Sequence, residues 1–383
     1  MMKKNSWDIQ DVHRVANVVA VIMFALWLQS CGSSRSMRQK NKLVDTKATA
    51  KTHYLFNRIK EIPKKGYAFG HQDATAYGIN WKNDGDTYQS DVQQVSGDFP
   101  GVYGFEIGHI ELGNQHNLDT VNFEVMRNLI RKAHKDKGII TISWHPNNPM
   151  SGKSSWDTTS TVKQILKGGV LYDSYKEYLA KVALFLKKLD GFWQSDIPVV
   201  FRPFHEMNGD WFWWGSSSCS PEEYKKLWRE TVAILSNELK VHNILYMYSP
   251  NLLKKEEEFL RYYPGDDYVD LLGVDVYQYT TDVEYMEILK RNLEVLKAIA
   301  VKKNMPYALS EAGHEKLDSS ENWWTEILDK SISNTGISWA LFWRNARESH
   351  FYVPFQGQKT SENFKAYRKL PHVLFLEEIS NIK

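Results

Sequence analysis

Two glutamates, Glu206 and Glu311, stand out because each directly follows a stretch that is typical of a buried strand. The apolar, β-branched run 197–200 leads to the first, and residues 305–310 lead to the second. Breaking a glycosidic bond takes two carboxyl groups: one protonates the leaving oxygen, and the other attacks the anomeric carbon or activates water. We therefore interpret Glu206 and Glu311 as a candidate catalytic pair.

Aromatic side chains crowd around the first of these glutamates. Trp211, Phe212, Trp213 and Trp214 all lie within nine residues of Glu206. Aromatic faces stack on the apolar faces of sugar rings, and an apolar wall raises the pKa of a carboxyl group by disfavouring its charged form. This environment is the one that a glycosidase general acid requires.

The elements that must position these residues alternate regularly along the chain. Predicted strands cover 66–70, 101–107, 138–144, 197–204, 243–248, 269–276, 305–310 and 336–343, and the clearest helices between them cover 121–137, 174–189, 221–239, 283–303 and 322–331. Eight strands alternating with helices predict the α/β class, as a single closed (β/α)8 TIM barrel. An open doubly wound sheet is the alternative, and its nucleotide-binding version is disfavoured because no glycine-rich phosphate loop follows any strand.

Polar and aromatic residues gather at the predicted strand ends, which in a (β/α)8 barrel form the catalytic face. These residues are Trp144-His145, His205-Glu206, Asp275 with Tyr277, Glu311, and Trp343-Arg344. His109, after the second strand, could face the cleft as a substrate contact or cap a loop. The clustering predicts a cleft at the C-terminal ends of the strands.

Two segments carry a resemblance to a known family. Residues 201–215 (FRPFHEMNGDWFWWG) and 309–313 (LSEAG) resemble glycoside hydrolase family 26, and the similarity spans roughly residues 50–370. The best-known members of this family are endo-β-1,4-mannanases, and its clan consists of retaining glycosidases on (β/α) barrels. The resemblance implies that Glu206 is the acid/base and Glu311 the nucleophile of a double displacement.

The resemblance also implies roles for neighbouring residues. His205 and Tyr277 are expected to hydrogen-bond the nucleophile, and Arg202 is a further candidate donor to it. The expected sugar contacts are His145, Trp156, Trp211, Asp275, Trp343 and Arg344, together with His109.

The resulting expectation is a retaining endo-β-1,4-mannanase that acts on β-mannan, galactomannan or manno-oligosaccharides. The same family leaves a β-1,3-xylanase or a mixed-linkage β-glucanase open, because linkage and epimer choice rest on a few contacts. A non-catalytic glycan-binding lipoprotein is a second alternative. It predicts a damaged catalytic pair, whereas both glutamates are present here.

Composition argues against other classes of function. The net charge is +2 and no basic stripe occurs, so a nucleic-acid partner is not expected. No Cys/His cluster exists, and His205 lacks a second histidine four residues later, so neither a metal nor another cofactor is expected. We expect a monomer.

The N-terminus is typical of a bacterial lipoprotein signal. Lys3, Lys4 and Arg14 precede the apolar run 18–28, which is too short to span a bilayer but suits a signal-peptide core. A small residue before Cys31 and Gly-Ser-Ser after it resemble a lipoprotein cleavage site; an ordinary secretory signal that contains a cysteine is the alternative.

This interpretation divides the chain into a signal peptide (1–30), a flexible tether (31–50) and a catalytic domain (51–375). Cys31 would carry a lipid that is the only membrane contact, in the cell envelope of a Gram-negative bacterium. The periplasmic side is favoured over the cell surface because no acidic run follows Cys31.

Overall fold

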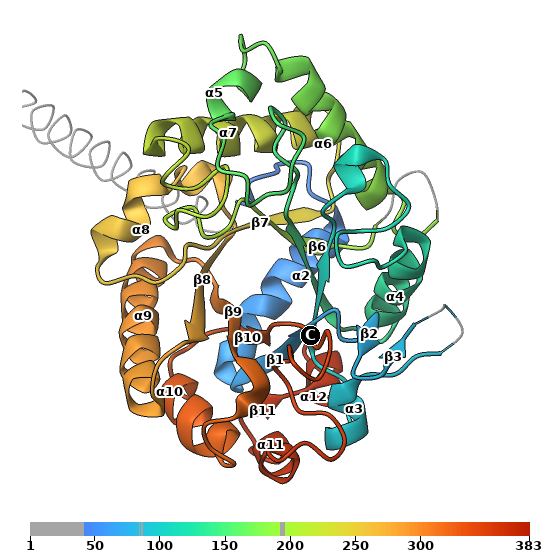
Figure 1. The fold of residues 1–383 in the computed structure, drawn as a ribbon, viewed down its shortest axis with the longest axis vertical. Helices are drawn as coiled ribbons and strands as arrows, with labels where there is room; N and C mark the ends of the chain where they lie inside the picture. The colour runs from blue at the N-terminus through green and yellow to red at the C-terminus, as the bar shows by residue number, and fades with distance from the viewer. Residues whose placement is uncertain (1–41, 84, 86, 192–195) are drawn as a thin grey trace, which may run out of the picture. The chain divides into compact units, whose positions relative to one another are not determined.

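The computed structural model describes residues 42–83, 85, 87–191 and 196–383. The predicted signal peptide, Cys31 and the tether up to residue 41 lie outside these residues. From Leu43 to Lys383 the chain forms one unit, shown in Figure 1. Among the described helices, none combines the length and the apolar character that crossing a membrane requires.

Eight parallel strands form the centre of this unit and close into a barrel, because β10 pairs with β1. In spatial order they are β1 (Tyr67–Gln72), β4 (Val102–Glu106), β5 (Ile139–Trp144), β6 (Val199–Pro203), β7 (Ile244–Tyr248), β8 (Leu271–Gln278), β9 (Tyr307–His314) and β10 (Trp339–Phe342). Each corresponds to a predicted strand, so the predicted (β/α)8 barrel is confirmed. The short β11 (Val373–Leu374) also pairs with β1, and β2 (Tyr77–Gly78) forms an antiparallel hairpin with β3 (Trp81–Lys82).

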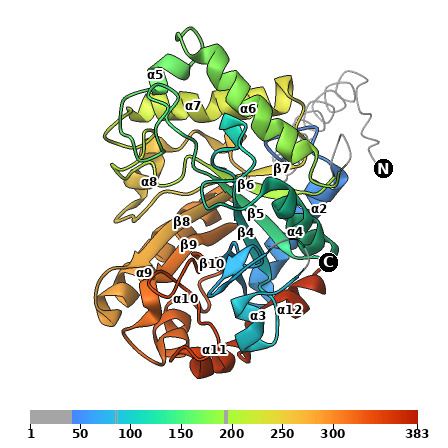
Figure 2. The same ribbon diagram turned by 45° about the vertical axis from the view of Figure 1, so that its right-hand side comes forward.

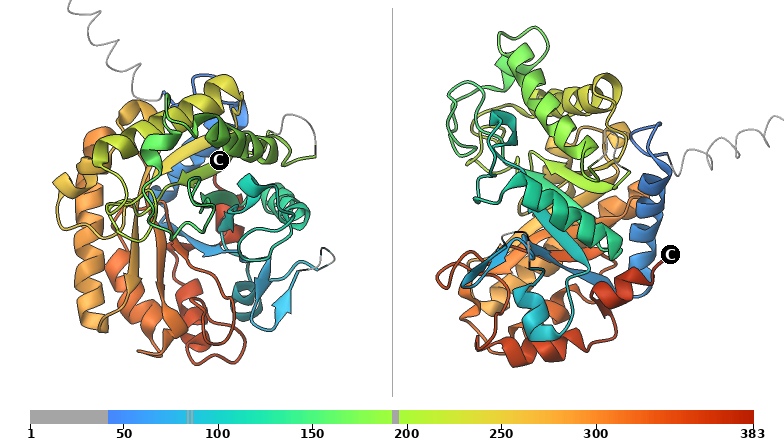
Figure 3. Two further views of the ribbon diagram at one scale, coloured as in Figure 1. Left: turned by 45° about the horizontal axis from the view of Figure 1, so that its top comes forward. Right: turned by 90° about the vertical axis from the view of Figure 1, so that its right-hand side faces the viewer.

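The barrel strands are buried on both faces, which explains their nearly continuous apolar sequences. Helices cover the outer face, as Figures 2 and 3 show. The α-helices are α2 (Ala50–Glu61), α3 (Asp91–Ser96), α4 (Phe123–Lys135), α5 (Val162–Ile165), α6 (Tyr172–Lys187), α7 (Pro221–Ala233), α8 (Glu256–Tyr262), α9 (Asp282–Lys303), α10 (Lys330–Ile332), α11 (Ser361–Arg368) and α12 (Leu376–Ser380).

The helix predictions differ from the structure mainly in helix type. α7 starts at Pro221 as predicted, because Ser220 and Glu223 form a capping box. It continues as a π-helical segment, η4 (Ile234–Glu238), and the predicted helix 322–331 is largely π-helical too, as η7 (Trp323–Asp329). A short π-helical segment changes the spacing of apolar residues along a helix very little. The sequence therefore does not distinguish it from an α-helix.

The bottom of the barrel is closed by α2 and by the residues before it. Leu55 and Ile59 of α2 pack in one apolar cluster with residues at the strand starts, including Ala68 and Val102. Ahead of α2, Leu43 is buried, and Asp45 contacts His242 at 2.6 Å. Residues 43–50, assigned to the tether above, are therefore packed against the barrel in this structure.

A β-bulge in β9 sets the direction of the side chains that follow it. Leu309 pairs with Val274 and Glu311 with Asp275, so Ser310 is an extra residue in the strand. A bulge bends a strand and re-aims the neighbouring side chains, and bulges are frequent next to active sites. Here it lies immediately before Glu311, at the C-terminal end of the barrel.

Candidate active site

Glu206 sits in a strained turn just after β6. Its φ is +54° and that of Phe204 is +52°, a left-handed region that non-glycine residues rarely adopt. The turn is held by several hydrogen bonds: the Glu206 amide donates to the Ser249 carbonyl at 2.9 Å, and Tyr224 Oη donates to the Phe204 carbonyl at 2.9 Å. Trp214 Nε1 also donates to the carbonyl of His205 at 2.8 Å. The aromatic run after Glu206 thus fixes its backbone as well as its surroundings.

Two donors reach the Glu206 carboxyl group. Asn251 Nδ2 lies 2.7 Å from Oε1, and Trp211 Nε1 lies 3.0 Å from Oε2. Burial and, next, the charge of Glu311 raise the pKa of Glu206 to about 7, although both donors act against the rise. Near neutral pH this carboxyl group can therefore both release and take up a proton.

Glu311 has a different set of partners, a phenol and a buried guanidinium. Tyr277 Oη donates to Oε2 at 2.8 Å, as predicted, and Arg202 pairs with Oε1. His205 Nε2 is 3.9 Å from the same Oε1, which is beyond hydrogen-bond distance. The predicted hydrogen bond from His205 to Glu311 is therefore absent from this structure, and Arg202 contacts that oxygen instead.

Arg202 is buried and links Glu311 to Asp275. Its second terminal nitrogen lies 3.0 Å from Asp275 Oδ2, and Ser310 Oγ lies 2.7 Å from Asp275 Oδ1. Burial raises the pKa of Asp275 well above its ordinary value, and the charge of Arg202 and the hydrogen bond from Ser310 act against that rise. Asp275 was predicted as a sugar contact, but here it is fully buried and contacts Arg202 and Ser310.

His145, at the end of β5, pairs with a buried glutamate that the sequence analysis missed. His145 Nδ1 lies 2.7 Å from Glu106 Oε2, and two backbone amides and Ser143 also donate to Glu106. Burial opposes a charge on either group, yet the pair raises the pKa of His145 and lowers that of Glu106. The His145 and His205 rings meet edge to face, with centroids 4.5 Å apart, so Glu106 orients the side chains next to Glu311.

Aromatic rings border the site around His145. Trp156 stacks on His145 with ring centroids 5.5 Å apart and is 53% exposed, so one of its faces is open to a ligand. Trp343 lies on another side of His145 at 6.3 Å and is half-buried. Trp213 and Trp214 are fully buried and hold the loop in place, so they are packing residues.

Arg344 and His109 lie further from the two glutamates. Arg344 pairs with Asp119 at 2.8 Å and donates to Tyr77 Oη at 3.2 Å. His109 is half-buried at the start of a single 3-10 turn, and it is an electrostatic neighbour of the same Asp119. These two predicted substrate contacts therefore border a separate part of the face, next to the β2–β3 hairpin.

Two residues of the site, Asn251 and Glu106, escaped the sequence analysis although the same rule could have found them. Asn251 follows the predicted strand 243–248, and Glu106 lies near the end of the predicted strand 101–107. Both are polar residues at strand ends, which a (β/α)8 barrel uses for its site. For metals, the described ranges contain no group of three or more His, Cys, Asp or Glu side chains that could hold an ion.

Comparison with known proteins relates this geometry to a family. Residues 44–327, well over half of the chain, match Glycosyl hydrolase family 26. The chain belongs to this family.

Relatives and solved structures of family 26 resemble the chain along most of its length. A mannan endo-1,4-beta-mannosidase of Bifidobacterium adolescentis is 30% identical over 363 residues, covering 88% of this chain; the chain spans only 36% of that relative. A GH26 beta-mannanase from Bacteroides ovatus is 40% identical with a TM-score of 0.83, covering 87% of this chain and 97% of that one. A modular endo-beta-1,4-mannanase from Cellulomonas fimi is 33% identical with a TM-score of 0.79, covering 88% of this chain and 78% of that one.

The electrostatic link between the two family 26 glutamates can be tested directly. Replacing Glu311 by Gln removes a negative charge near Glu206, so the pKa of Glu206 should fall below about 7. Carbon-13 NMR titration of the labelled Glu206 carboxyl group measures this change. The matched control is Glu315→Gln, four residues after Glu311 and partnered by His350. An unchanged or higher pKa in Glu311→Gln would contradict the proximity of the two groups.

Proposed function

We propose that the chain is a retaining endo-β-1,4-mannanase that hydrolyses β-mannan, galactomannan or manno-oligosaccharides. The observation that carries this proposal is the difference between the surroundings of the two acids. Glu206 has a pKa raised to about 7, whereas Glu311 is paired with buried Arg202 and hydrogen-bonded by Tyr277. A glycosidase needs one carboxyl group that donates a proton and a second one that acts as a carboxylate, and in a retaining enzyme the second attacks the sugar directly.

In the first step, Glu311 acts as the nucleophile. A carboxylate oxygen forms a bond to the anomeric carbon while the bond to the leaving oxygen breaks, and Glu206 transfers its proton to that oxygen. A covalent glycosyl ester on Glu311 results, and Glu206 is left as a carboxylate. Asn251 and Trp211 then stabilise this charged form through their hydrogen bonds.

In the second step, Glu206 acts as the base. It takes a proton from a water molecule, whose oxygen bonds to the anomeric carbon as the ester bond to Glu311 breaks. Both side chains return to their starting states, and the two inversions leave the product with the configuration of the substrate. A pKa near 7 suits this double role because the group must be a competent acid and then a competent base.

Mannan is the proposed substrate because the similar proteins carry names that specify it. The Bifidobacterium adolescentis relative and the Cellulomonas fimi structure are both described as acting on β-1,4-linked mannan. Exposed Trp156 and half-buried Trp211 and Trp343 supply stacking surfaces around the reacting position. Such surfaces bind the apolar faces of a pyranose chain.

The proposed roles of Glu311 and Glu206 predict different losses of activity when each residue is replaced by alanine. Glu311→Ala should lower kcat at least about 10⁴-fold on every substrate, because no covalent intermediate can form. Glu206→Ala should retain the first step on 2,4-dinitrophenyl β-mannobioside, since this leaving group needs little protonation. Pre-steady-state release of dinitrophenol measures that step. Equal loss of the burst in both variants would refute the assignment.

Substrate preference can be measured by parallel reducing-sugar assays. We expect kcat/KM to be highest on glucomannan and locust bean galactomannan, with at least about tenfold lower values on barley β-glucan and β-1,3-xylan. Faster hydrolysis of either control polysaccharide would replace the mannanase proposal by that activity. No new reducing ends on any of them would favour a glycan-binding protein without catalysis.

We also propose that lipidation of Cys31 anchors the protein in a Gram-negative envelope, facing the periplasm. The support is the sequence around Cys31. Cys31→Ser should move the full-length protein from the membrane fraction to the soluble fraction of the cells. Cys219→Ser is the matched control, since Cys219 is buried in the domain. Retention of Cys31→Ser in the membrane fraction would contradict the lipid anchor. Cleavage of the wild-type protein by protease added to intact cells would contradict its periplasmic location.

A further inference from the structure

Basic side chains gather at the end of the barrel that lies away from the two glutamates. Residues 42–66, which contain α2 and its flanks, hold seven lysines and arginines but only two acids, whereas residues 67–383 hold more acids than bases. α2 (blue) closes the strand starts, on the side where the C-terminus also lies in the right-hand panel of Figure 3. We call this surface the basic face, and its exposed or half-buried lysines are Lys47, Lys51, Lys60, Lys64 and Lys65, together with Lys135 and Lys137 at the end of α4.

The end of α4 belongs to the basic face because buried Arg58 of α2 joins the two segments. Arg58 donates to the carbonyl of Lys137 at 2.8 Å and, near the C-terminus, to that of Ile379 at 2.9 Å. Burial and, next, the charges of Lys51 and Arg58 lower the pKa of His134 in the last turn of α4. Positive charge is therefore concentrated where α2 and α4 meet.

Few acids contact the lysines of the basic face. Glu61 pairs with Lys64 at 2.7 Å, and Asp196 lies 3.8 Å from Lys51. Within the part of the chain that the structure describes, four lysines of this face have no ion-pair partner: Lys47, Lys65, Lys135 and Lys137. Helix stability does not explain Lys47 and Lys51, because they lie at the N-terminal end of α2, where the helix dipole disfavours a positive charge. The pattern therefore indicates an anionic partner.

Apolar groups lie beside these lysines. A recess of about 290 Å³ at the end of α9 is lined chiefly by Lys60, Pro63, Val301, Met305, Pro306 and Tyr307. Val301 is 69% exposed, and Tyr54 on the outer side of α2 is 51% exposed. A second recess of about 180 Å³ shares Pro63 with the first and is lined by Lys64 and Lys65. Lysines beside exposed apolar and aromatic groups are typical of surfaces that lie on a membrane.

The point at which the chain enters the barrel favours a lipid surface over other anionic partners. Leu43 is buried among the strand starts, so the chain reaches the barrel at the basic face. Cys31, the proposed lipid attachment site, is twelve residues earlier, and twelve residues span at most about 40 Å. Arg35, Arg38 and Lys40 add positive charge to this stretch, which contains no acid. Basic clusters next to a membrane anchor attract anionic lipids.

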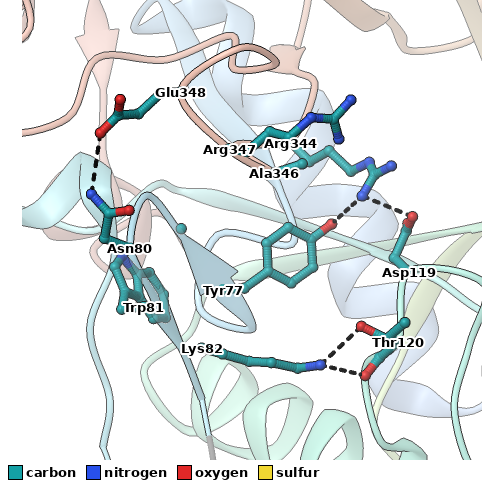
Figure 4. A pocket seen from close by; sticks show the side chains of 11 residues that line it. Tyr77, Asn80, Trp81, Lys82, Asp119, Thr120, Arg344, Ala346, Arg347 and Glu348 are labelled. Carbon is teal, nitrogen blue, oxygen red and sulfur yellow. Dashed lines mark hydrogen bonds and ion pairs between the residues drawn. The ribbon is translucent and has the colours of Figure 1, made fainter.

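We infer that the basic face docks on an anionic lipid surface and holds the catalytic end of the barrel away from the membrane. Glu206 and Glu311 lie at that catalytic end, and the recess lined by Tyr77, Asp119 and Arg344 (Figure 4) opens there too. Docking through α2 therefore leaves the site open to a polymeric substrate. The inference takes the anchor from the proposed function, but the charge of the basic face does not depend on Cys31.

Vesicle co-sedimentation of residues 43–383 tests this inference without the lipid anchor. This compact unit contains the closed barrel and both of its apolar clusters, so it is expected to fold alone. It should bind vesicles made of equal parts phosphatidylglycerol and phosphatidylcholine. Binding to phosphatidylcholine alone should be at least about tenfold weaker, and high salt should release the protein from the anionic vesicles.

Two variants that each lose four positive charges locate the docking surface. The first combines Lys47→Gln, Lys51→Gln, Lys64→Gln and Lys65→Gln on the basic face. The matched control combines four exposed lysines in loops at the catalytic end, as Lys153→Gln, Lys254→Gln, Lys255→Gln and Lys359→Gln. The first variant should bind the anionic vesicles at least about tenfold more weakly than the unaltered unit, and the control should stay within twofold of it.

Unchanged binding of the first variant would overturn the inference, and so would equal weakening in both variants. Near-UV circular dichroism checks that both variants are folded. Binding of the unaltered unit that resists high salt would also contradict an electrostatic surface, and this measurement needs no variant. The proposed anchor fails separately: vesicle binding by residues 43–383, combined with a wild-type protein that is soluble in cells, would refute lipidation of Cys31 alone.

Discussion

The arrangement of acidic side chains at the centre of the barrel depends on the positive charge of the buried Arg202 guanidinium. Arg202 lies between Glu311 and Asp275, with its own side chain and that of Glu311 at most 5% exposed and Asp275 fully buried. Removing one partner of such a buried pair leaves an uncompensated charge and typically costs about 3–5 kcal/mol. The same arrangement serves the proposed chemistry, because a carboxylate held against Arg202 is available as a nucleophile.

The contrast between the two glutamates follows from their different neighbours. Glu311 contacts a cation, whereas Glu206 contacts an amide and an indole, and these neutral donors only partly offset its burial. The strained turn at Phe204 and Glu206 brings the second carboxyl group toward the first, and surrounding hydrogen bonds hold that turn. The fold thus keeps one acid able to hold a proton beside one that is paired with a positive charge.

Much of this could be predicted from the sequence because a (β/α)8 barrel places its chemistry at strand ends. Glu206, Glu311, His145 and Tyr277 were found by that rule and by the resemblance to family 26. The Arg202 partnership was only partly foreseen. Its partner Glu311 follows the bulge at Ser310, which shifts the register between β8 and β9 and leaves no trace in strand periodicity.

Other features depend on contacts between distant segments. Arg344 was expected at a sugar site, but its partner Asp119 lies in a loop that no local pattern distinguishes. The packing of residues 43–50 also requires the strand ends to be in place, since Asp45 contacts His242 nearly two hundred residues later. Polar composition near residue 45 therefore suggested a tether where the structure has a packed segment.

The central claim is that Glu311 attacks the sugar while Glu206 serves as acid and then base. Proton NMR of the first products formed from mannohexaose, recorded before mutarotation, tests it most directly. Two successive inversions predict that the β-anomer appears first at the new reducing end. An α-anomer as the first product would mean direct attack by water and would contradict the account.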